Sequence, residues 1–447
     1  MNNYILKRLL TIGLIGFLLY EQRGQVIGAT GKQVTRIPFL PVKLVLSQDK
    51  ICTMQRVSPQ TIAIAPSDRK LQRVSSQPII SAEGQSIAYE SSALITAEED
   101  SGESSTVFVA ELSTGIVEQV DVNNQGQPAN NISKLAGMSL NGRYVAFVSY
   151  ATNLVDGTSQ GNLFIRDRLN NITELVPLAD NLRLGLLVDP SVSLSVNGRY
   201  VAFGNLDLAN VYLYDRELDK TELISLEPEN ISRYSFQPTI SADGRYVAFT
   251  SGLYGQAPNS VYLRDRLMGT TEVVSVDLDG KPAQGYTPAI SVNGRYIAFA
   301  SSASNLVKGD TNNVDDIFVR DQVDKSTKRV SVSSTGQQAN GLSMELAIAP
   351  GGHSVAFKSE ASNLVQGDTN KTEDVFVHNL DQSSTERVSI SSTGQQANDA
   401  SSQPTLAISD RAVAFTSEAT NLVEGDTNGV SDVFIRMCSN NRQQNIQ

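Results

Sequence analysis

Three loops of the chain carry acidic and amide side chains at a spacing that could bind a metal ion. Each contains Asp-Thr-Asn and a further Asp six residues after the first, and together they contribute Asp310, Asn312, Asp316, Asp368, Asn370, Asp374, Asp426, Asn428 and Asp432. Such hard oxygens are the ligands that Ca²⁺ takes, although the bidentate Glu that closes an EF-hand loop is missing. The same residue types also hydrogen-bond to the backbone of a tight loop. Calcium binding and a self-contained turn are both open interpretations.

The sequence offers few residues for other kinds of catalysis. It has two histidines, His353 and His378, which restricts acid–base chemistry on imidazole and His-rich metal sites. It contains no His-Glu-x-x-His and no phosphate-binding glycine loop. Carboxylates are plentiful, but their spacing in the sequence does not place two of them across one substrate. We therefore expect a protein without enzymatic activity.

The candidate loops belong to a repeat with seven copies. Its first signature is Ser-x-Asn/Asp-Gly-Arg-Tyr-Val/Ile-Ala-Phe, which occurs four times nearly unchanged and three times in degenerate form. The seven copies begin at Ser81, Ser139, Ser195, Ser241, Ser291, Ala349 and Ser409. Asn-Gly or Asp-Gly between two β-prone runs is a strong hairpin signal, because both turn residues adopt positive φ. Each repeat therefore contains two strands joined by a tight hairpin.

Two further strands complete each repeat. A third follows as Asp316-Ile-Phe-Val-Arg-Asp321 and its equivalents, and a fourth as a Thr/Arg/Val/Ser run such as Thr327 to Val332. The apolar runs are continuous rather than alternating, which suits sheets that are packed on both faces. The pattern predicts an all-β fold, a seven-bladed β-propeller of four-stranded antiparallel blades. An open solenoid of seven units is the alternative.

The two ends of the repeat region indicate how the ring closes. The seventh repeat stops after its third strand, Asp432 to Met437, whereas the run Thr53 to Ser58 before the first repeat is similar to a fourth strand. We therefore expect the N-terminal strand to complete the last blade. This pairing brings Cys52 and Cys438 to positions that flank a hairpin turn in an intact blade, so we predict a disulfide between them. Two free thiols are the alternative.

These motifs resemble the TolB-type, WD-like β-propeller repeat. The resemblance rests on Ser-x-Asn/Asp-Gly-Arg-Tyr-Val-Ala-Phe followed by Asp-Ile-Phe-Val-Arg-Asp, and it covers residues 51–438. The stretch before the first blade is too short for the separate N-terminal domain of TolB, so the similarity concerns the propeller and not TolB itself. The family is common in bacterial envelope and secreted proteins. The resemblance implies a binding scaffold.

The N-terminus has the layout of a secretory signal. Lys7 and Arg8 precede an apolar run from Leu9 to Tyr20, which is shorter than the about 20 residues of a membrane-spanning helix, and small residues lead to Ala29. We expect a signal peptide over 1–29, an extension over 30–50, the propeller over 51–438 and a tail over 439–447. The mature protein would be periplasmic or secreted, without membrane insertion. An uncleaved membrane anchor is the alternative.

Charge and loop composition suggest a class of function. A net charge of -11 without clusters of Lys and Arg argues against nucleic acid as a partner. The long loops between second and third strands, and those leading to the next blade, should emerge on one face, here called the long-loop face. We expect a monomeric, non-catalytic scaffold without a cofactor other than calcium, which binds a protein or carbohydrate partner through this face. The alternatives are a propeller hydrolase with a carboxylate site at the central channel and a calcium-stiffened structural surface protein.

Overall fold

The computed structural model describes residues 50–58, 63–64, 70–95, 104–158, 161–177, 192–205, 209–226, 233–253, 259–409 and 411–440. The predicted signal peptide over 1–29 lies outside these residues, as do most of the extension over 30–50 and of the tail over 439–447. No helix in the described part of the chain is long and apolar enough to span a membrane.

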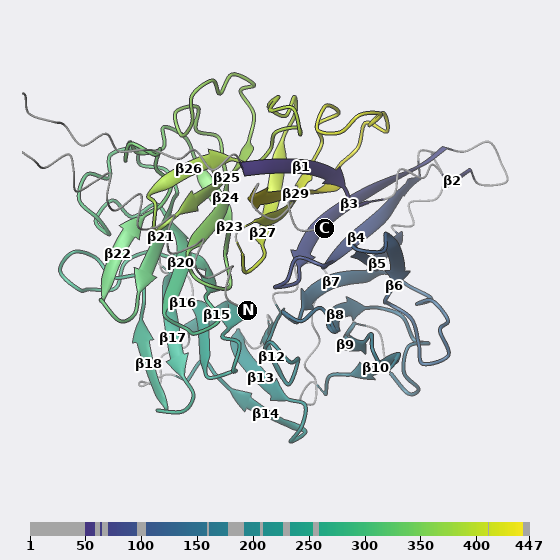
Figure 1. The fold of residues 1–447 in the computed structure, drawn as a ribbon. Coiled ribbons are helices and arrows are strands. Elements are labelled where there is room, and N and C mark those ends of the chain that lie inside the picture. The colour runs from purple at the N-terminus through teal and green to yellow at the C-terminus, as the bar shows by residue number, and fades with distance from the viewer. Residues whose placement is uncertain are drawn as a thin grey trace, which may run out of the picture. The chain divides into compact units, whose positions relative to one another are not determined.

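The described residues form seven antiparallel sheets, each a blade of four strands, and the first blade has a short fifth strand at its edge. Figure 1 shows the sheets following one another around the molecule in chain order. The first strands of the blades are β3 (Lys70–Ile80), β7 (Ser133–Met138), β11 (Val192–Leu194), β15 (Arg233–Ile240), β19 (Tyr286–Ile290), β23 (Ser343–Ile348) and β27 (Ser401–Leu406). The second strands are β4 (Ser86–Ile95), β8 (Tyr144–Ser149), β12 (Tyr200–Asn205), β16 (Tyr246–Leu253), β20 (Tyr296–Ser301), β24 (Ser354–Ser359) and β28 (Ala412–Ser417). The predicted seven-bladed propeller is confirmed.

The outer half of each blade consists of its third and fourth strands. The third strands are β5 (Ser104–Glu111), β9 (Asn162–Asp167), β13 (Asn210–Asp215), β17 (Ser260–Asp265), β21 (Asp316–Asp321), β25 (Asp374–Asn379) and β29 (Asp432–Asn440). The fourth strands are β6 (Ile116–Gln119), β10 (Ile172–Leu175), β14 (Lys220–Leu223), β18 (Thr270–Val273), β22 (Ser326–Arg329), β26 (Ser384–Arg387) and, in the last blade, β1 (Lys50–Arg56). The additional strand β2 (Ala63–Ile64) pairs with β3 at the edge of the first blade.

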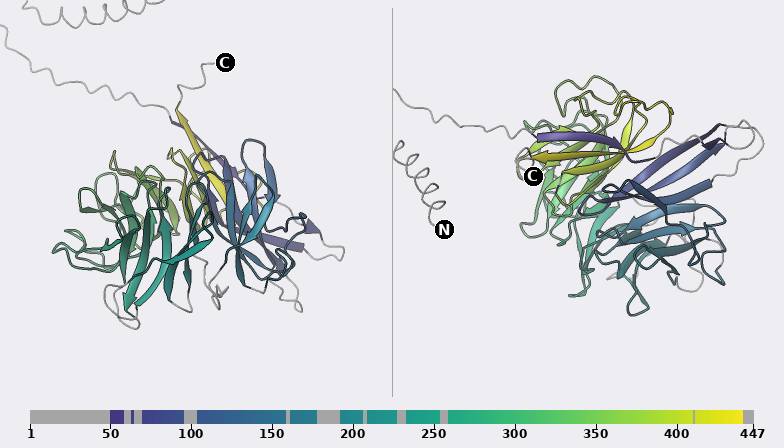
Figure 2. Two further views of the ribbon diagram at one scale, coloured as in Figure 1. Left: turned by 90° about the horizontal axis from the view of Figure 1, so that it is seen from below. Right: turned by 45° about the vertical axis from the view of Figure 1, so that its right-hand side comes forward.

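The ring closes through β1, as the sequence predicts. Its sheet has the strand order β1-β29-β28-β27, and Figure 2 shows β1 lying along β29. Cys52 and Cys438 face each other in the register, their Cα atoms are 4.0 Å apart, and a disulfide joins them. The predicted disulfide is confirmed, and it joins two residues whose separation in sequence is 386.

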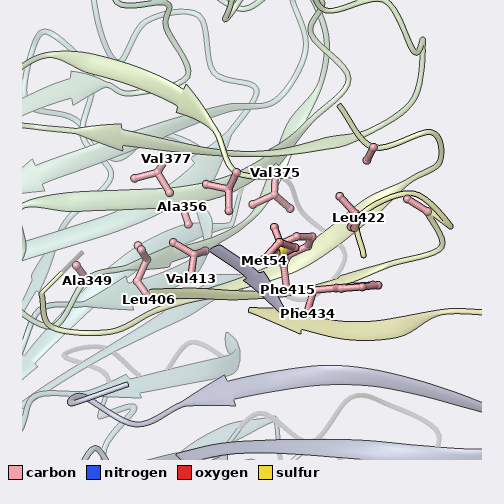
Figure 3. Close-up of a cluster of buried hydrophobic side chains, with 13 residues drawn as sticks. Met54, Ala349, Ala356, Val375, Val377, Leu406, Val413, Phe415, Leu422 and Phe434 are labelled. Carbon is pink, nitrogen blue, oxygen red and sulfur yellow. The ribbon is translucent and has the colours of Figure 1, made fainter. Parts of the chain in front are cut away.

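The hydrophobic core lies between neighbouring blades. Within a blade, an aromatic ring of the third strand lies against one of the second strand. An example is the last blade, where the ring centroids of Phe415 and Phe434 are 6.0 Å apart. Met54 of β1 is buried in the same cluster, which also includes Val375 and Val377 of the preceding blade (Figure 3). The N-terminal strand is therefore part of the core as well as of the sheet.

The tight hairpins between first and second strands pack closely against the preceding blade. Gly198 has a φ of +67°, and a Cβ placed on it would lie 2.3 Å from Cδ2 of Tyr144, so only glycine fits both the turn and the contact. Backbone hydrogen bonds then link successive hairpins, from Val196 N to Ala242 O and from Ala242 N to Val292 O. Val292 N in turn donates to Pro350 O, and the series stops there because proline has no N–H to donate. They tie together the hairpin end of the central channel.

Candidate functional site

The first predicted calcium loop encloses an arginine side chain. Arg329 of β22 places Nη1 3.4 Å from Oδ1 of Asp310 and 3.5 Å from Oδ2 of Asp316. Gln338 Nε2 donates to both carboxylates at 2.9 Å, and Ser331 Oγ donates to Asp316. The guanidinium thus supplies the positive charge that the two carboxylates need.

The other two loops repeat this arrangement. Their arginines are Arg387, beside Asp368 and Asp374, and Arg56, beside Asp426 and Asp432. The loop asparagines Asn312, Asn370 and Asn428 each donate Nδ2 to the second Asp of their loop. Burial raises the pKa of Asp316, Asp368 and Asp426. The structure therefore brings the nine predicted residues together in three groups of three, each around an arginine, and calcium binding by them stays a prediction.

A signal for these arginines was present in the sequence. The three fourth-strand arginines pair in register with Phe318, Phe376 and Phe434 of the third strands. At the same register position three of the four blades without an Asp pair carry apolar residues, Leu175, Leu223 and Val273, and the first blade carries the uncharged Gln119. Arginine and the Asp pair therefore occur together in three blades, which indicates an internal ion pair.

The centre of the propeller contains a cavity of about 440 Å³. Its wall is formed by consecutive residues of the first strands: Gln77 and Pro78, Leu135 and Ala136, Val192, Gln237 and Pro238, Thr287 and Pro288, Glu345 and Leu346, and Gln403 and Pro404. Each described blade thus contributes to one cavity. This volume falls in the range of about 300–1,000 Å³ that is typical of small-molecule sites.

A bend in five of the first strands places a polar residue of each at the cavity wall. Gln77, Gln237, Thr287, Glu345 and Gln403 all have φ between 49° and 54°, the left-handed region that non-glycine residues rarely adopt. Each lies in a β-bulge, where the strand shifts its register against the second strand. Strained backbone of this kind is concentrated at functional sites, and here it recurs in five blades.

The bulged residues are connected around the channel by hydrogen bonds from blade to blade. Gln237 Oε1 accepts a hydrogen bond from Thr287 N at 3.2 Å, and Gln403 Oε1 accepts one from Gln77 N at 2.9 Å. Glu345 Oε2 accepts one from Gln403 N at 2.8 Å. Three backbone N–H groups of the bulges, those of Gln77, Thr287 and Gln403, are therefore satisfied by side chains of the neighbouring blade.

Glu345 is the one charged residue among the described residues that line this cavity. Lys358 of the adjacent strand β24 places Nζ 2.7 Å from its Oε1, and the side chains of Lys358 and Glu345 are 15% and 35% exposed. A partly exposed carboxylate held beside a less exposed ammonium group can accept a proton from a bound molecule, and the ammonium can stabilise negative charge that develops there. The pair is the best candidate for chemistry in the channel.

A second, apolar cavity of about 200 Å³ continues the channel. Its wall includes Met138, Leu194, Ile240, Ile290 and Ile348, which follow the bulges toward the hairpins. Because each first strand runs from the long-loop face to the hairpin, the polar cavity lies on the long-loop side of the apolar one. A polar molecule would therefore reach Glu345 from the long-loop face.

Our sequence reasoning missed the channel residues, although a signal was present. A polar residue followed by proline occurs four positions before the hairpin serine in Gln77-Pro78, Gln237-Pro238 and Thr287-Pro288. Glu345 stands at the equivalent position before Ala349. A recurring polar residue within an otherwise apolar inner strand indicates a channel-facing position.

The two histidines lie away from the channel wall. His353 is exposed and its Nδ1 is 2.9 Å from Asp381. His378 is buried, its Nδ1 is 2.9 Å from Thr385 Oγ1, and burial lowers its pKa to about 4. Other blades carry arginine at the position of His378, for example Arg166 and Arg320.

We expect His378 to make the fold sensitive to mild acid. Because the folded protein favours the neutral imidazole, its stabilising contribution is complete above pH 6.5 and is lost as the pH falls toward 4. Between pH 7 and pH 5 the free energy of unfolding should fall by about 2 kcal/mol more in the parent than in His378→Arg. Urea titrations of both proteins at the two pH values measure this difference, and equal losses would contradict the assignment.

Neither a protein-family model nor a curated protein sequence matches the chain. Among solved structures, an oligogalacturonate lyase from Vibrio parahaemolyticus superposes with a TM-score of 0.52 at 14% identity, covering 86% of this chain and 93% of that one. An oligogalacturonate lyase described in complex with manganese gives a TM-score of 0.51 at 12% identity with the same coverage. A prolyl endopeptidase gives 0.51 at 11% identity, covering 83% of this chain and 50% of that one. At these identities the similarity shows the propeller fold alone.

The predicted non-catalytic scaffold is wrong, because the three superposed structures named above, which share the propeller fold, are enzymes. They fit the alternative better, a carboxylate site at the central channel. The expectation of no enzymatic activity loses its support for the same reason. The polar loop side chains that suggested a partner-binding face are also largely engaged with one another: Asn340 N donates to Asn363 Oδ1, and Asn340 Nδ2 donates to Ser362 Oγ.

Proposed function

We propose that this protein is an enzyme that cleaves glycosidic bonds of an oligosaccharide in the polar cavity of its channel. The observation that carries the proposal is Glu345, a carboxylate on the cavity wall that is paired with Lys358 and held by the backbone of Gln403. Its position corresponds to the channel-centred alternative rather than to a binding face on the loops.

The extent of the structural similarity favours a carbohydrate substrate over a peptide. The superposition covers 93% of the oligogalacturonate lyase chains but only 50% of the prolyl endopeptidase chain. Half of the peptidase therefore has no counterpart here, whereas nearly the whole lyase does. A propeller that constitutes almost an entire enzyme must hold its own reacting groups, and we carry this reasoning to the present chain.

The side chains of the cavity suit a substrate rich in hydroxyl groups. Amide groups can both donate and accept hydrogen bonds. Gln237 and Gln403 accept hydrogen bonds from neighbouring backbone N–H groups through Oε1, and their Nε2 groups take no part in these bonds. In the proposed reaction Glu345 takes up one proton, from the attacking water in a hydrolysis or from the carbon beside a uronate carboxyl group in an elimination, and returns it to the oxygen of the leaving sugar as the glycosidic C–O bond breaks. The Lys358 ammonium group stabilises the negative charge that develops beside it.

The side chains of this chain do not fit a manganese site like the one implied by the description of one superposed lyase. Among the described residues there is no group of three or more His, Cys, Asp or Glu side chains that could hold a metal ion. Glu345 contributes a single carboxylate, and Lys358 already supplies the positive charge beside it. We derive no step of the reaction through a metal.

We further propose that the mature protein acts outside the cytoplasm. The Cys52–Cys438 disulfide supports export, because structural disulfides persist in oxidising compartments. The periplasmic or secreted location rests on the N-terminal sequence pattern and on the TolB-type repeat motif, and we retain both as proposals.

A panel of neutral and uronate-containing oligosaccharides, each incubated with the purified protein, tests the proposed function. We expect new reducing ends with at least one member, and ultraviolet absorbance of an unsaturated product would distinguish elimination from hydrolysis. Glu345→Gln should lower kcat at least about 100-fold, because the amide retains the hydrogen bond to Gln403 but cannot take up a proton.

Glu360→Gln is the matched control for this assay. Glu360 is exposed on the same blade, outside the channel, so the substitution should leave kcat within about twofold. Equal activity of Glu345→Gln and the parent, or cleavage of no oligosaccharide in the panel, would overturn the proposed function.

A further inference from the structure

Arginines in the turn after the third strand connect neighbouring blades on the side of the hairpins. Arg216 of the third blade lies over the ring of Tyr144 of the second blade, with its Cζ 4.4 Å from the ring centroid. Its guanidinium also binds Glu174 of β10 and donates from Nη1 to Gly198 O at 2.7 Å. The group therefore has three partners: an aromatic ring, a carboxylate and a hairpin carbonyl.

The next junction repeats this arrangement. Arg266 lies 4.5 Å from the ring centroid of Tyr200, binds Glu222 of β14 and donates to Gly244 O. At the junction between the first and second blades, Arg168 makes the carboxylate and carbonyl contacts with Glu118 and Gly142. Three consecutive junctions thus hold a guanidinium group in the same kind of site.

The junction between the fourth and fifth blades keeps the site but lacks the arginine. Glu272 pairs in register with Leu263, as Glu222 does with Leu213, so it has the position of the carboxylates above. The equivalent of Arg266 is Gln322, which directly follows Asp321 in the turn after β21. A cavity of about 320 Å³ is present there, and Tyr246, Glu272, Gly294 and Gln322 line it.

The junction between the fifth and sixth blades lacks both the arginine and the carboxylate of this site. There the equivalent of Gln322 is Leu380, which packs in an apolar cluster with Tyr296. The equivalent of Glu272 is Lys328, which pairs in register with Val319. The carboxylate is therefore lost together with the arginine at this junction, whereas at the preceding one the carboxylate remains.

The charges inside the cavity leave Glu272 accessible to an incoming cation. Lys325 Nζ lies 3.0 Å from Glu272 Oε2 and 3.1 Å from Gln322 Oε1, but the side chains of Lys325 and Glu272 are 52% and 48% exposed. An exposed ion pair of this kind contributes little to stability, so an incoming cation readily displaces Lys325 from Glu272. Gln322 Nε2 is buried without a hydrogen-bond partner among the described residues, which indicates that the amide does not fill the site.

The other charged groups at the rim are paired within their own blades. Arg295 binds Asp321 and lies 4.9 Å from the ring centroid of Tyr296. Asp265 is bound by Arg245, which also lies 4.7 Å from the ring centroid of Tyr246. Among the described residues, Tyr144 and Tyr200 each have two guanidinium neighbours, whereas Tyr246 has this one.

We propose that the cavity between the fourth and fifth blades binds a guanidinium group from outside the chain, either free arginine or an arginine side chain of a peptide. The ligand replaces the missing arginine: its guanidinium lies against Tyr246, pairs with Glu272 and donates to Gly294 O. Cation–π contact and a charge-assisted hydrogen bond distinguish it from a neutral analogue of the same shape. The site is separate from the channel.

Titration calorimetry with Nα-acetyl-L-arginine methylamide tests the proposal, with the citrulline analogue as a neutral control and free L-arginine as the second arm. We expect saturable binding of the arginine compound and at least about tenfold weaker binding of the citrulline analogue. Tighter binding of free arginine would identify an amino acid as the ligand, whereas tighter binding of the blocked compound would identify a side chain within a peptide.

Variants of the cavity separate specific binding from surface binding. Gln322→Arg places an arginine where the three other junctions have one. Its guanidinium should occupy the cavity, and the variant should therefore lose binding and have a higher Tm. Glu272→Gln should weaken binding about tenfold, and Lys325→Ala should strengthen it, because the competing ammonium is gone. Equal heats for the arginine and citrulline compounds, or undiminished binding by Gln322→Arg or Glu272→Gln, would overturn the proposal.

Discussion

Replacing both cysteines, Cys52→Ala with Cys438→Ala, should lower the free energy of unfolding by about 5 kcal/mol. The bond joins residues whose separation is 386, and the entropy that a crosslink removes from the unfolded chain grows with the length of the loop it closes. It also holds β1, the strand that completes the last blade and buries Met54 in the core. Urea titration of the parent and the double variant measures the loss.

Reduction of the parent protein is the control for this experiment, because it breaks the bond without changing any side chain in the core. The reduced parent and the double variant should unfold at the same urea concentration. A loss below about 1 kcal/mol in both would contradict the view that the crosslink secures the closure of the ring.

The largest effect of a single substitution should come from Arg387→Met, which we expect to cost about 4 kcal/mol at pH 7. Arg387 is the cation beside Asp368 and Asp374, whose side chains are almost fully buried. Removing it leaves two buried carboxylates close together without a counter-charge. Because burial raises the pKa of Asp368, protonation of this carboxylate should reduce the cost as the pH is lowered.

Lys371→Met is the matched control for Arg387→Met. It removes a lysine from the same loop, but its side chain is exposed, so the free energy of unfolding should change by less than about 0.5 kcal/mol. A similar, small effect of both substitutions in urea titrations at pH 7 would contradict the assignment of Arg387 as the internal cation of the loop.

The fold was predictable from the sequence because the repeat carries its turns and its core in one local pattern. Asn-Gly and Asp-Gly specify the hairpins, and the Val-Ala-Phe runs specify strands buried on both faces. The closure was predictable for a different reason. The last repeat lacks a fourth strand, and the N-terminal run before the first repeat is similar to one. Each of these two segments also has a cysteine beside it. Pairing the two segments explains both observations.

The candidate site was not predictable in the same way, because it depends on contacts between blades. Glu345 comes to the channel wall through a bulge with left-handed backbone, and the residue that holds its Oε2, Gln403, belongs to the next blade. The ion pairs of the three Asp-x-Asn loops were not predicted because Arg329 and its equivalents lie on the fourth strand and not in the loop, and calcium binding by these loops stays a prediction. Spacing within one loop contains no information about such a partner.

The most direct test of the channel site is a crystal structure of Glu345→Gln with the oligosaccharide that the parent cleaves. The variant should retain the substrate without converting it. Our account predicts the ligand in the polar cavity, with the bond to be cleaved within hydrogen-bonding reach of residue 345 and hydroxyl groups on the amides of Gln237 and Gln403. An oligosaccharide bound to the outer loops, with none in the channel, would contradict it.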